Sequence, residues 1–308
     1  MLNLKDKIIE LKKKKNAVIL AHNYQNPEIQ DIADFTGDSL GLSIKASKTK
    51  ADIILFCGVH FMAETAVLAS PSKKVILPDI TAGCPMADMI TADDLRKLKI
   101  QNLPADRHGP KSKVVCYVNS SAEVKAESDI CCTSANSVDV VNSIKDTDEI
   151  IFVPDKYLGM YTQSKCPDKK FILWNGYCPT HARILPEYLE VAKANHPKAK
   201  VLVHPECRPE VIAQADEVLS TGGMIKFVQK AEAKEFIIAT EINMLYALKK
   251  IAPDKIFYPA TELATCPNMR KITLEKVIWS LEEEKTIVTV PQEIAVRAKR
   301  AVDAMLSI

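Results

Sequence analysis

The chain has 308 residues, of which 47% are hydrophobic and 26% are charged, a composition typical of a globular protein. Its formal net charge is +2, from 41 Lys and Arg against 39 Asp and Glu, which gives no reason to expect a nucleic-acid or membrane partner. Because the sequence has no apolar run near the roughly 20 residues that span a bilayer and no signal-peptide pattern, we expect a cytoplasmic protein.

The predicted elements begin with an amphipathic helix, because Leu4, Ile8 and Leu11 recur at helical spacing. The basic run Lys12–Lys15 at its end is typical of a solvated face. The apolar run "AVILA" then predicts a buried strand. Two helices follow this strand, the second of them at "SLGLSIKAS". Next come a strand at "DIILFCG", a third helix and a strand at "KKVILP", which leads to Cys84.

This order of elements recurs twice more along the chain. When the segments that begin at His22, Tyr117 and His204 are aligned, with no gap needed until a one-residue gap before the last set, residues of the same chemical type coincide in all three. The coinciding sets are Glu28, Glu123 and Glu210, then Asp34, Asp129 and Asp216, then Ser39, Ser134 and Thr221, and finally the Cys-Pro pairs at Cys84, Cys178 and Cys266. Four coincidences in register indicate a triplicated unit.

Strands that alternate with helices predict an α/β fold with parallel sheets covered on both faces. We expect three pseudo-equivalent three-layer α/β/α domains with small parallel sheets around a pseudo-threefold axis. The expected boundaries are 1–100, 101–185 and 186–270, and two C-terminal helices within 271–308 are expected to pack against the first domain. Since ligands of open parallel sheets lie beyond the carboxyl ends of the strands, the residues that follow the strands should face one central cavity.

Only Cys84, Cys178 and Cys266 recur as cysteines in every repeat. For the other cysteines, which are Cys57, Cys116, Cys131, Cys132, Cys166 and Cys207, ordinary placement is expected. Three thiolates suit a zinc ion with an open fourth position, or a [4Fe–4S] cluster with one thiolate on each of three irons. The threefold face of the cluster matches three equivalent ligands better, and its fourth iron would be free to act as a Lewis acid. The alternative to a metal site is that the three cysteines are buried at the ends of strands and have no chemical role.

Polar residues at equivalent positions supply the rest of a predicted site. Ser39, Ser134 and Thr221 fall near helix starts, where free N–H groups bind carboxylate or phosphate. A cap that serves its own helix would explain any one of them, but three that face one cavity predict a polyanionic substrate. The places after the first strands hold the proton-transfer and donor groups His22, Tyr24, Tyr117, Asn119, His204 and Glu206. The histidines outside this pattern, His60, His108 and His196, are expected to be structural.

The sequence closely resembles the quinolinate synthase family of NAD biosynthesis. The resemblance covers essentially the whole chain and is carried by "AHNYQ", "GDSLGLS", "AGCPMAD", "YVNSSAEVKAESD", "NGYCPTHARI", "HPEC", "STGGM" and "TCPNM". It implies three pseudo-equivalent domains around a central [4Fe–4S] cluster. The implied reaction condenses iminoaspartate with dihydroxyacetone phosphate to quinolinate, phosphate and water. Some longer relatives carry a C-x-x-C near the last ligand, but Met269 stands at that position here.

The resemblance also implies roles for particular residues. Cys84, Cys178 and Cys266 would be the cluster ligands, and the substrates would contact His22, Ser39, Tyr117, Asn119, Ser134, His181, His204, Glu206 and Thr221. The catalytic residues would be Tyr24, Glu206, His22, His204 and Tyr117, with Tyr24 and Glu206 as acid/base groups. The partners would be the two small-molecule substrates, and the enzyme that supplies iminoaspartate is a candidate protein partner.

Two other functions fit the same residues. One is a different [4Fe–4S] hydro-lyase, which would use the open iron on another polyanionic substrate. The other is a sensor or scaffold that contains zinc or a cluster and has no catalytic activity. The sequence predicts neither the oligomeric state nor the order of the chemical steps.

Overall fold

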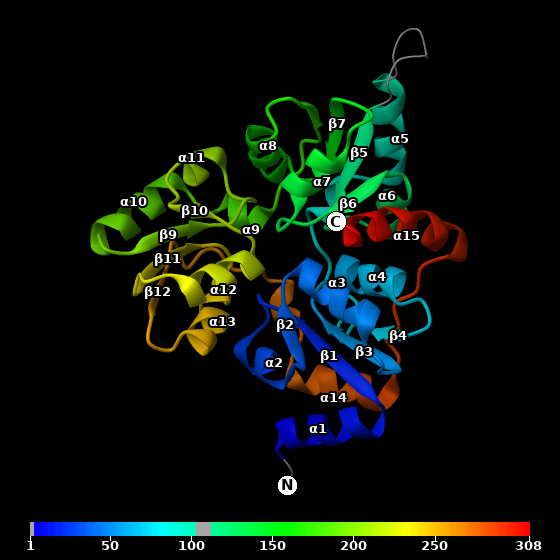
Figure 1. The fold of residues 1–308 in the computed structure, drawn as a ribbon. Coiled ribbons are helices and arrows are strands. Elements are labelled where there is room, and N and C mark those ends of the chain that lie inside the picture. Colours follow the sequence, from blue (N-terminus) through cyan, green and yellow to red (C-terminus); the bar gives the residue numbers. More distant parts are fainter. Residues whose placement is uncertain (1–2, 103–111) are drawn as a thin grey trace.

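The computed structural model describes residues 3–102 and 112–308, in which three four-stranded parallel sheets surround a common centre (Figure 1). The first sheet contains β1 (Ala17–His22), β2 (Phe35–Gly37), β3 (Ile53–Cys57) and β4 (Lys74–Ile76). The second contains β5 (Lys113–Tyr117), β6 (Ile130–Cys132), β7 (Glu149–Val153) and β8 (Lys170–Leu173). The third contains β9 (Lys200–Val203), β10 (Glu217–Val218), β11 (Glu235–Ala239) and β12 (Ile256–Pro259). The strand orders β2-β1-β3-β4, β6-β5-β7-β8 and β10-β9-β11-β12 repeat one topology, and the α/β fold class is confirmed.

Each sheet carries helices at equivalent places along the chain. They are α2 (Pro27–Ile32), α3 (Ser39–Lys48) and α4 (His60–Ala69) in the first repeat, α6 (Ala122–Ala126), α7 (Ser137–Ser143) and α8 (Lys156–Lys165) in the second, and α11 (Pro209–Ile212), α12 (Thr221–Lys230) and α13 (Met244–Ile251) in the third. A further helix precedes each first strand: α1 (Leu4–Lys14), α5 (Ala92–Gln101) and α10 (Pro186–Asn195). The repeat therefore begins one helix earlier than the sequence alignment predicts.

The last two helices of the chain lie in different places. The α14 helix (Leu274–Glu283) packs beside α1 and the first sheet, whereas α15 (Gln292–Leu306) lies across α6 and β6 and also contacts α4 (Figure 1). The segment 271–308 is thus shared between the first and second repeats. Short helices stand at the Cys-Pro pairs: α9 (Pro179–Ala182) begins at the proline of its pair, and η1 (Ala87–Met89) and η2 (Met269–Lys271) begin two residues after theirs.

The repeated aspartates hold the edge strand of each sheet, a role that their recurrence alone does not indicate. Each carboxylate accepts a 2.8 Å hydrogen bond from a backbone N–H of the first strand, and the aspartate's own N–H donates to the carbonyl of that same strand residue. The pairs are Asp34 with Ile19, Asp129 with Val114 and Asp216 with Val201. The edge strands β2, β6 and β10 that follow have only two or three residues, which is too short for hydrophobic periodicity to predict.

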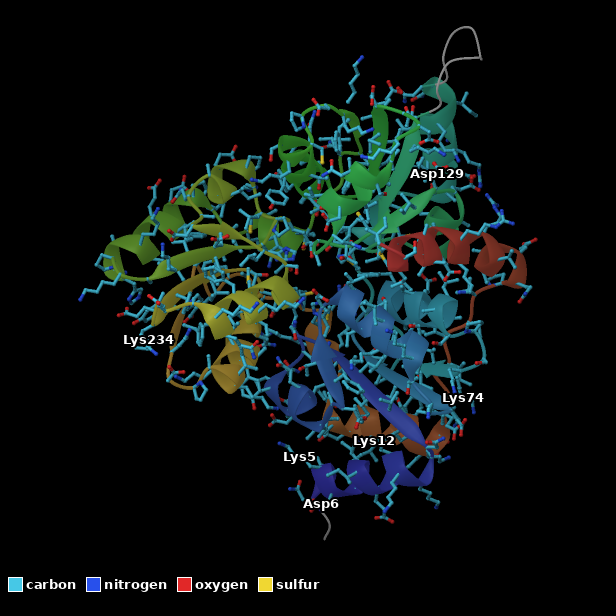
Figure 2. All side chains as sticks on the ribbon, viewed as in Figure 1. Lys5, Asp6, Lys12, Lys74, Asp129 and Lys234 are labelled. Carbon is cyan, nitrogen blue, oxygen red and sulfur yellow. The ribbon has the colours of Figure 1, made fainter. Side chains whose placement is uncertain are left out.

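The strands are almost continuously apolar because helices cover both faces of each sheet. All five residues of β3 are buried, for example, and each fully buried large aliphatic side chain contributes about 1.5–3 kcal/mol to folding. Most charged side chains lie outside the core, as Lys5, Asp6 and Lys12 do on α1 (Figure 2). Lys12 pairs with Asp34 at 2.7 Å, consistent with the predicted solvated face. Within the described residues, none of the helices has the length and apolar character needed to cross a membrane.

Candidate active site

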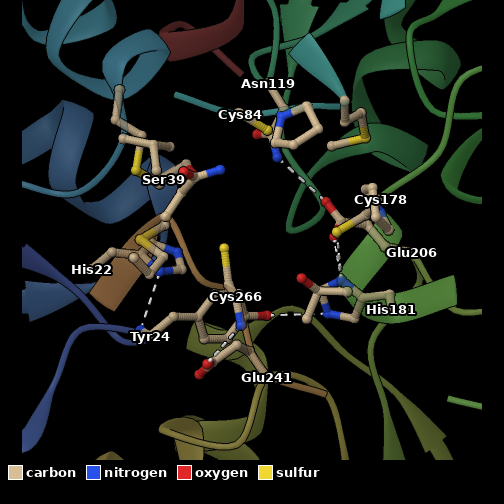
Figure 3. A pocket seen from close by; sticks show the side chains of 18 of the residues that line it. His22, Tyr24, Ser39, Cys84, Asn119, Cys178, His181, Glu206, Glu241 and Cys266 are labelled. Atoms are coloured by element: carbon tan, nitrogen blue, oxygen red, sulfur yellow. Dashed lines mark hydrogen bonds and ion pairs between the residues drawn. The ribbon is translucent and has the colours of Figure 1, made fainter. Parts of the chain in front are cut away.

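A cavity of about 200 Å³ lies where the three repeats meet (Figure 3). All of the site residues predicted from the sequence line it, namely His22, Tyr24, Ser39, Cys84, Tyr117, Asn119, Ser134, Cys178, His181, His204, Glu206, Thr221 and Cys266. The ends of β1, β5 and β9 supply His22, His204 and the tyrosine, asparagine and glutamate side chains, and the turns after β4, β8 and β12 supply the cysteines, with His181 on α9 just after Cys178. The parallel arrangement therefore brings together groups that are far apart in the sequence.

The three Cys-Pro turns present sulfur atoms to the cavity in a similar way (Figure 3). In each turn, backbone N–H groups two or three residues further on favour the thiolate and partly lower its pKa: those of Met86 and Ala87 for Cys84, that of His181 for Cys178, and those of Asn268 and Met269 for Cys266. Burial raises the pKa of all three thiols, that of Cys84 to about 12. A positively charged metal centre would offset this cost of ionisation.

The spacing of the sulfur atoms distinguishes between the metals considered from the sequence. Two sulfurs on one zinc ion, at bonds of about 2.3 Å, lie at most about 4.6 Å apart. Among the described residues, the three cysteines do not form a group of donors that all lie within 4.8 Å of one another. A cluster binds each thiolate through a different iron. In this arrangement the donor set does not fit one zinc ion held by three sulfurs.

Glu206 is the centre of a buried polar network between the second and third repeats. Its Oε1 accepts hydrogen bonds from the Tyr117 hydroxyl at 2.6 Å and from Asn119 Nδ2 at 3.4 Å. Its Oε2 lies 2.7 Å from His181 Nδ1 and 3.8 Å from His204 Nδ1. Burial alone would raise the pKa of Glu206, but the adjacent His181 and these donors lower it. The carboxylate is therefore ionised and acts only as an acceptor.

The network continues to Tyr24 in the first repeat through a residue that the sequence analysis did not identify. Thr240 Oγ1 lies 2.8 Å from His181 Nε2 and 2.5 Å from the Tyr24 hydroxyl. Because the Glu206 carboxylate can only accept, Nδ1 of His181 donates to it; in the neutral ring Nε2 then accepts from Thr240, and Thr240 accepts from Tyr24. One continuous chain of hydrogen bonds thus joins Tyr24 to Glu206. Thr240 does not belong to a set of residues that recurs in the three repeats. It was not identified from the sequence because its role depends on contacts that form only where the repeats meet.

Two further histidines face the cavity as neutral rings. Burial lowers the pKa of His22 to about 4 and that of His204 to about 3. Nδ1 of each ring accepts from a backbone N–H, that of Tyr24 at 3.2 Å and that of Glu206 at 3.4 Å. The proton of each neutral ring is therefore on Nε2, and His204 Nε2 lies 3.2 Å from Ser134 Oγ. Both rings can donate to a substrate without carrying a charge.

The repeated hydroxyl residues are not the helix caps. Ser39 and Thr221 are the first residues of α3 and α12, while the caps are Asp38 and Ser220, whose side chains accept from Gly41 and Gly223. Ser134 lies in the turn before α7. The hydroxyls of Ser39 and Thr221 are consequently not used in capping. Asp38 also accepts from Ser220 Oγ at 3.2 Å, which links the starts of α3 and α12.

Glu241 is another buried group that the sequence analysis missed. Its Oε1 accepts from the Cys266 N–H at 3.2 Å and its Oε2 from the Asn243 N–H at 2.7 Å, so it positions the third Cys-Pro turn. Burial raises its pKa. A signal was present in the repeat: Glu241 stands two residues after β11, as the buried Asp155 stands two residues after β7. In the first repeat the residue two positions after β3 is Val59, which is not acidic, so the three repeats do not share an acidic residue at this position.

The remaining histidines and cysteines lie away from this cavity wherever the structure describes them. His196 stacks on Tyr258 with ring centroids 3.4 Å apart, and His60 Nδ1 lies 3.7 Å from Glu64. His108 lies outside the described residues. The other cysteines are buried and are not part of the cavity wall: Cys57, Cys116, Cys131, Cys132, Cys166 and Cys207.

Comparison with known proteins identifies the family. The family model described as "Quinolinate synthetase A protein" (NadA) matches residues 6–307. The chain is 57% identical over 302 residues to a quinolinate synthase of Dehalococcoides mccartyi, a match that covers 98% of this chain and 97% of the relative. Quinolinate synthases of Methanosarcina barkeri and Thermodesulfovibrio yellowstonii are 54% and 51% identical over 303 residues, again with 98% and 97% covered. The chain belongs to the quinolinate synthase family of enzymes.

Proposed function

We propose that the chain condenses iminoaspartate with dihydroxyacetone phosphate to give quinolinate, phosphate and water, with Cys84, Cys178 and Cys266 holding a [4Fe–4S] cluster. The observation that carries the proposal is the convergence of three Cys-Pro turns and the Tyr24–Glu206 hydrogen-bond chain on one cavity, in a chain with high identity to quinolinate synthases. When bound, such a cluster supplies an open iron, a Lewis acid for a hydroxyl or carboxylate of the substrate.

The substrate anions would bind near the starts of α3 and α12. Both are ten-residue helices whose first N–H groups favour carboxylate and phosphate. The hydroxyls of Ser39 and Thr221 and the Nε2–H groups of His22 and His204 add neutral donors. Neutral donors suit this place because they bind an anion without neutralising the ionised Glu206.

Protons would move through Tyr24 and Glu206. Glu206 is ionised and can take a proton from the substrate as a general base, and Tyr24 has a hydroxyl proton to give. The chain of hydrogen bonds through Thr240 and His181 connects the two groups without solvent. A proton that Glu206 takes from the substrate can therefore be matched by a proton that Tyr24 gives to it. Tyr117 and Asn119 hold the Glu206 carboxylate in one orientation.

The organisation and the setting of the enzyme are part of the proposal. We propose domains at 1–100, 101–185 and 186–270, since each of these ranges contains one complete sheet. Iminoaspartate is an imine that water hydrolyses, so an enzyme that supplies it nearby in the cytoplasm is the proposed partner.

The alternative function of another [4Fe–4S] hydro-lyase has no observation in its favour, because the relatives cited above are quinolinate synthases.

A product assay under argon tests the proposal. Full-length protein is purified anaerobically, its iron is measured, and it is supplied with iminoaspartate and dihydroxyacetone phosphate while quinolinate is quantified by chromatography. Wild-type protein should form quinolinate, and Glu206→Gln should keep its iron but lose about 100-fold or more in rate. Iron-replete wild-type protein that forms no quinolinate would refute the function, and a fully active Glu206→Gln would refute the role of that residue.

A further inference from the structure

Three candidate metal ligands meet beside the second Cys-Pro turn. Among the described residues, Cys178, His181 and Glu206 are the only three candidate ligands whose donor atoms all lie within 4.8 Å of one another. His181 Nδ1 lies 3.2 Å from Cys178 Sγ and 2.7 Å from Glu206 Oε2. Sulfur, imidazole nitrogen and carboxylate oxygen are the three donor types that zinc prefers. We propose that the cluster-free protein binds one Zn²⁺ ion through Cys178, His181 and Glu206.

The geometry needs little change to accept the ion. In tetrahedral zinc sites, bonds of about 2.0–2.3 Å place donor atoms about 3.4–3.6 Å apart. The two distances from His181 Nδ1, 3.2 Å to Cys178 Sγ and 2.7 Å to Glu206 Oε2, lie slightly inside that separation, and all three donors lie within 4.8 Å of one another, so shifts of about 1 Å open the site. His181 and Glu206 are 1% and 3% exposed, and the cavity beside them leaves room for a water molecule as the fourth ligand.

The groups around these ligands match those of natural zinc sites. A histidine that binds zinc almost always has its other ring nitrogen hydrogen-bonded, and a ligating carboxylate is itself hydrogen-bonded. With the metal on Nδ1, His181 Nε2–H donates to Thr240 Oγ1, which lies 2.8 Å away. The second oxygen of Glu206 already accepts from Tyr117 and Asn119. The same contacts exist without the metal, with Thr240 donating to Nε2 instead of accepting from it, which separates the site from a chance approach of three ligands.

Zinc at this site and the proposed cluster exclude each other because they share Cys178. A bound zinc ion takes the Cys178 thiolate, whose proton goes to solvent, and leaves only Cys84 and Cys266 free. Iron and sulfide then cannot assemble on three cysteines. The inference identifies the apo-protein as a target for zinc, and zinc as a competitor of cluster assembly.

Zinc titration of the full-length, cluster-free protein under argon tests the ligand set. Calorimetry with Zn²⁺, together with Co²⁺ absorption to detect a thiolate–metal bond, should give one ion per chain. Cys178→Ser and His181→Ala should weaken binding at least about 100-fold, and Thr240→Val, which changes only the supporting network, about 10- to 100-fold. Cys84→Ser and Cys266→Ser, the matched controls, should bind zinc within about threefold of wild type. Equal losses in all three cysteine variants, or no stoichiometric binding by wild type, would overturn the site.

Competition between the metals gives a second readout. With one equivalent of zinc added first, wild-type protein should take up little iron during reconstitution, whereas His181→Ala should take up iron as it does without zinc. Circular dichroism checks that His181→Ala is folded. Unimpeded iron uptake by zinc-treated wild type would contradict the proposal. Neither readout uses substrate or turnover, so both are independent of whether the proposed reaction is correct.

Discussion

The Tyr24 hydroxyl of the first repeat lies 2.5 Å from the Thr240 hydroxyl of the third, and this contact completes the chain of hydrogen bonds that reaches Glu206. Thr240 is 2% exposed, so water cannot easily replace its hydroxyl. The two ends of the chain are the groups to which we assign proton transfer. The chain exists only because two distant parts of the sequence meet at the cavity.

Thr240→Val should interrupt this chain while filling nearly the same volume. Because positioned acid–base groups contribute about 10²- to 10⁴-fold to rate, we expect quinolinate formation to slow by at least about 100-fold. Thr240→Ser keeps the hydroxyl and should retain activity within about tenfold of wild type. Iron content should be unchanged in both variants. Equal rates for Val and Ser would show that the hydroxyl is not needed.

The buried Glu64 carboxylate joins the first repeat to the second, and its removal should destabilise the protein. Its Oε2 accepts from the Ala122 N–H at 3.0 Å, and the charge of the fully buried Lys125 acts to lower the pKa that burial raises. Glu64→Ala leaves that N–H and the lysine charge without this partner, which should lower the free energy of unfolding by about 1–3 kcal/mol. Glu123→Ala, an exposed neighbour, should change it by less than about 0.5 kcal/mol. Urea denaturation measures both, and similar values would contradict the assignment.

Gly222 permits the close approach of α12 to Asp38. A Cβ at this position would stand 2.4 Å from Asp38 Oδ2, in a carboxylate that is already fixed by its cap on Gly41. Gly222→Ala should displace that carboxylate and cost about 1 kcal/mol, the usual value of a lost cap. Gly37→Ala, whose Cβ would meet only ordinary contacts at 3.7 Å, is the control.

A double-mutant cycle isolates this contact by thermal or urea unfolding. In an Asp38→Ala background there is no carboxylate left to displace, so Gly222→Ala should cost clearly less than it does in wild type. A full cost in both backgrounds would place the effect of the alanine elsewhere.

The Asp79 carboxylate should make the free energy of unfolding depend on pH in the acidic range. Burial would raise its pKa, but Lys276, whose Nζ lies 2.6 Å away, and Thr81 lower it to about 2. A group whose pKa is lower in the folded state stabilises the protein above its unfolded pKa of about 3.9, and this contribution disappears as the pH falls to about 2. Asp79→Asn should therefore be less stable than wild type at pH 6, and the difference should shrink between pH 4 and pH 2. A difference in unfolding free energy that does not change with pH would contradict this.

The repeats and the meeting of the three Cys-Pro cysteines at one cavity could be predicted from sequence because triplication leaves a visible record. Cys84, Cys178 and Cys266 keep residue type and interval, and His22, Tyr117 and His204 keep position. Thr240 could not be predicted, because its partners Tyr24 and His181 lie in other segments and no periodicity reports contacts between repeats. Similarly, β10 has two residues and gives no pattern. Asp34 and its equivalents were recognised as repeated, but only the structure reveals that they hold edge strands.

The account depends most on three sulfur atoms binding one cluster. Iron should therefore be measured in anaerobically purified wild type, in Cys84→Ser, Cys178→Ser and Cys266→Ser, and in Cys57→Ser as the control from a buried strand outside the cavity. We predict about four irons per chain in wild type and Cys57→Ser, and almost none in the other three variants. Iron content that is the same in Cys57→Ser and Cys84→Ser would contradict the central claim.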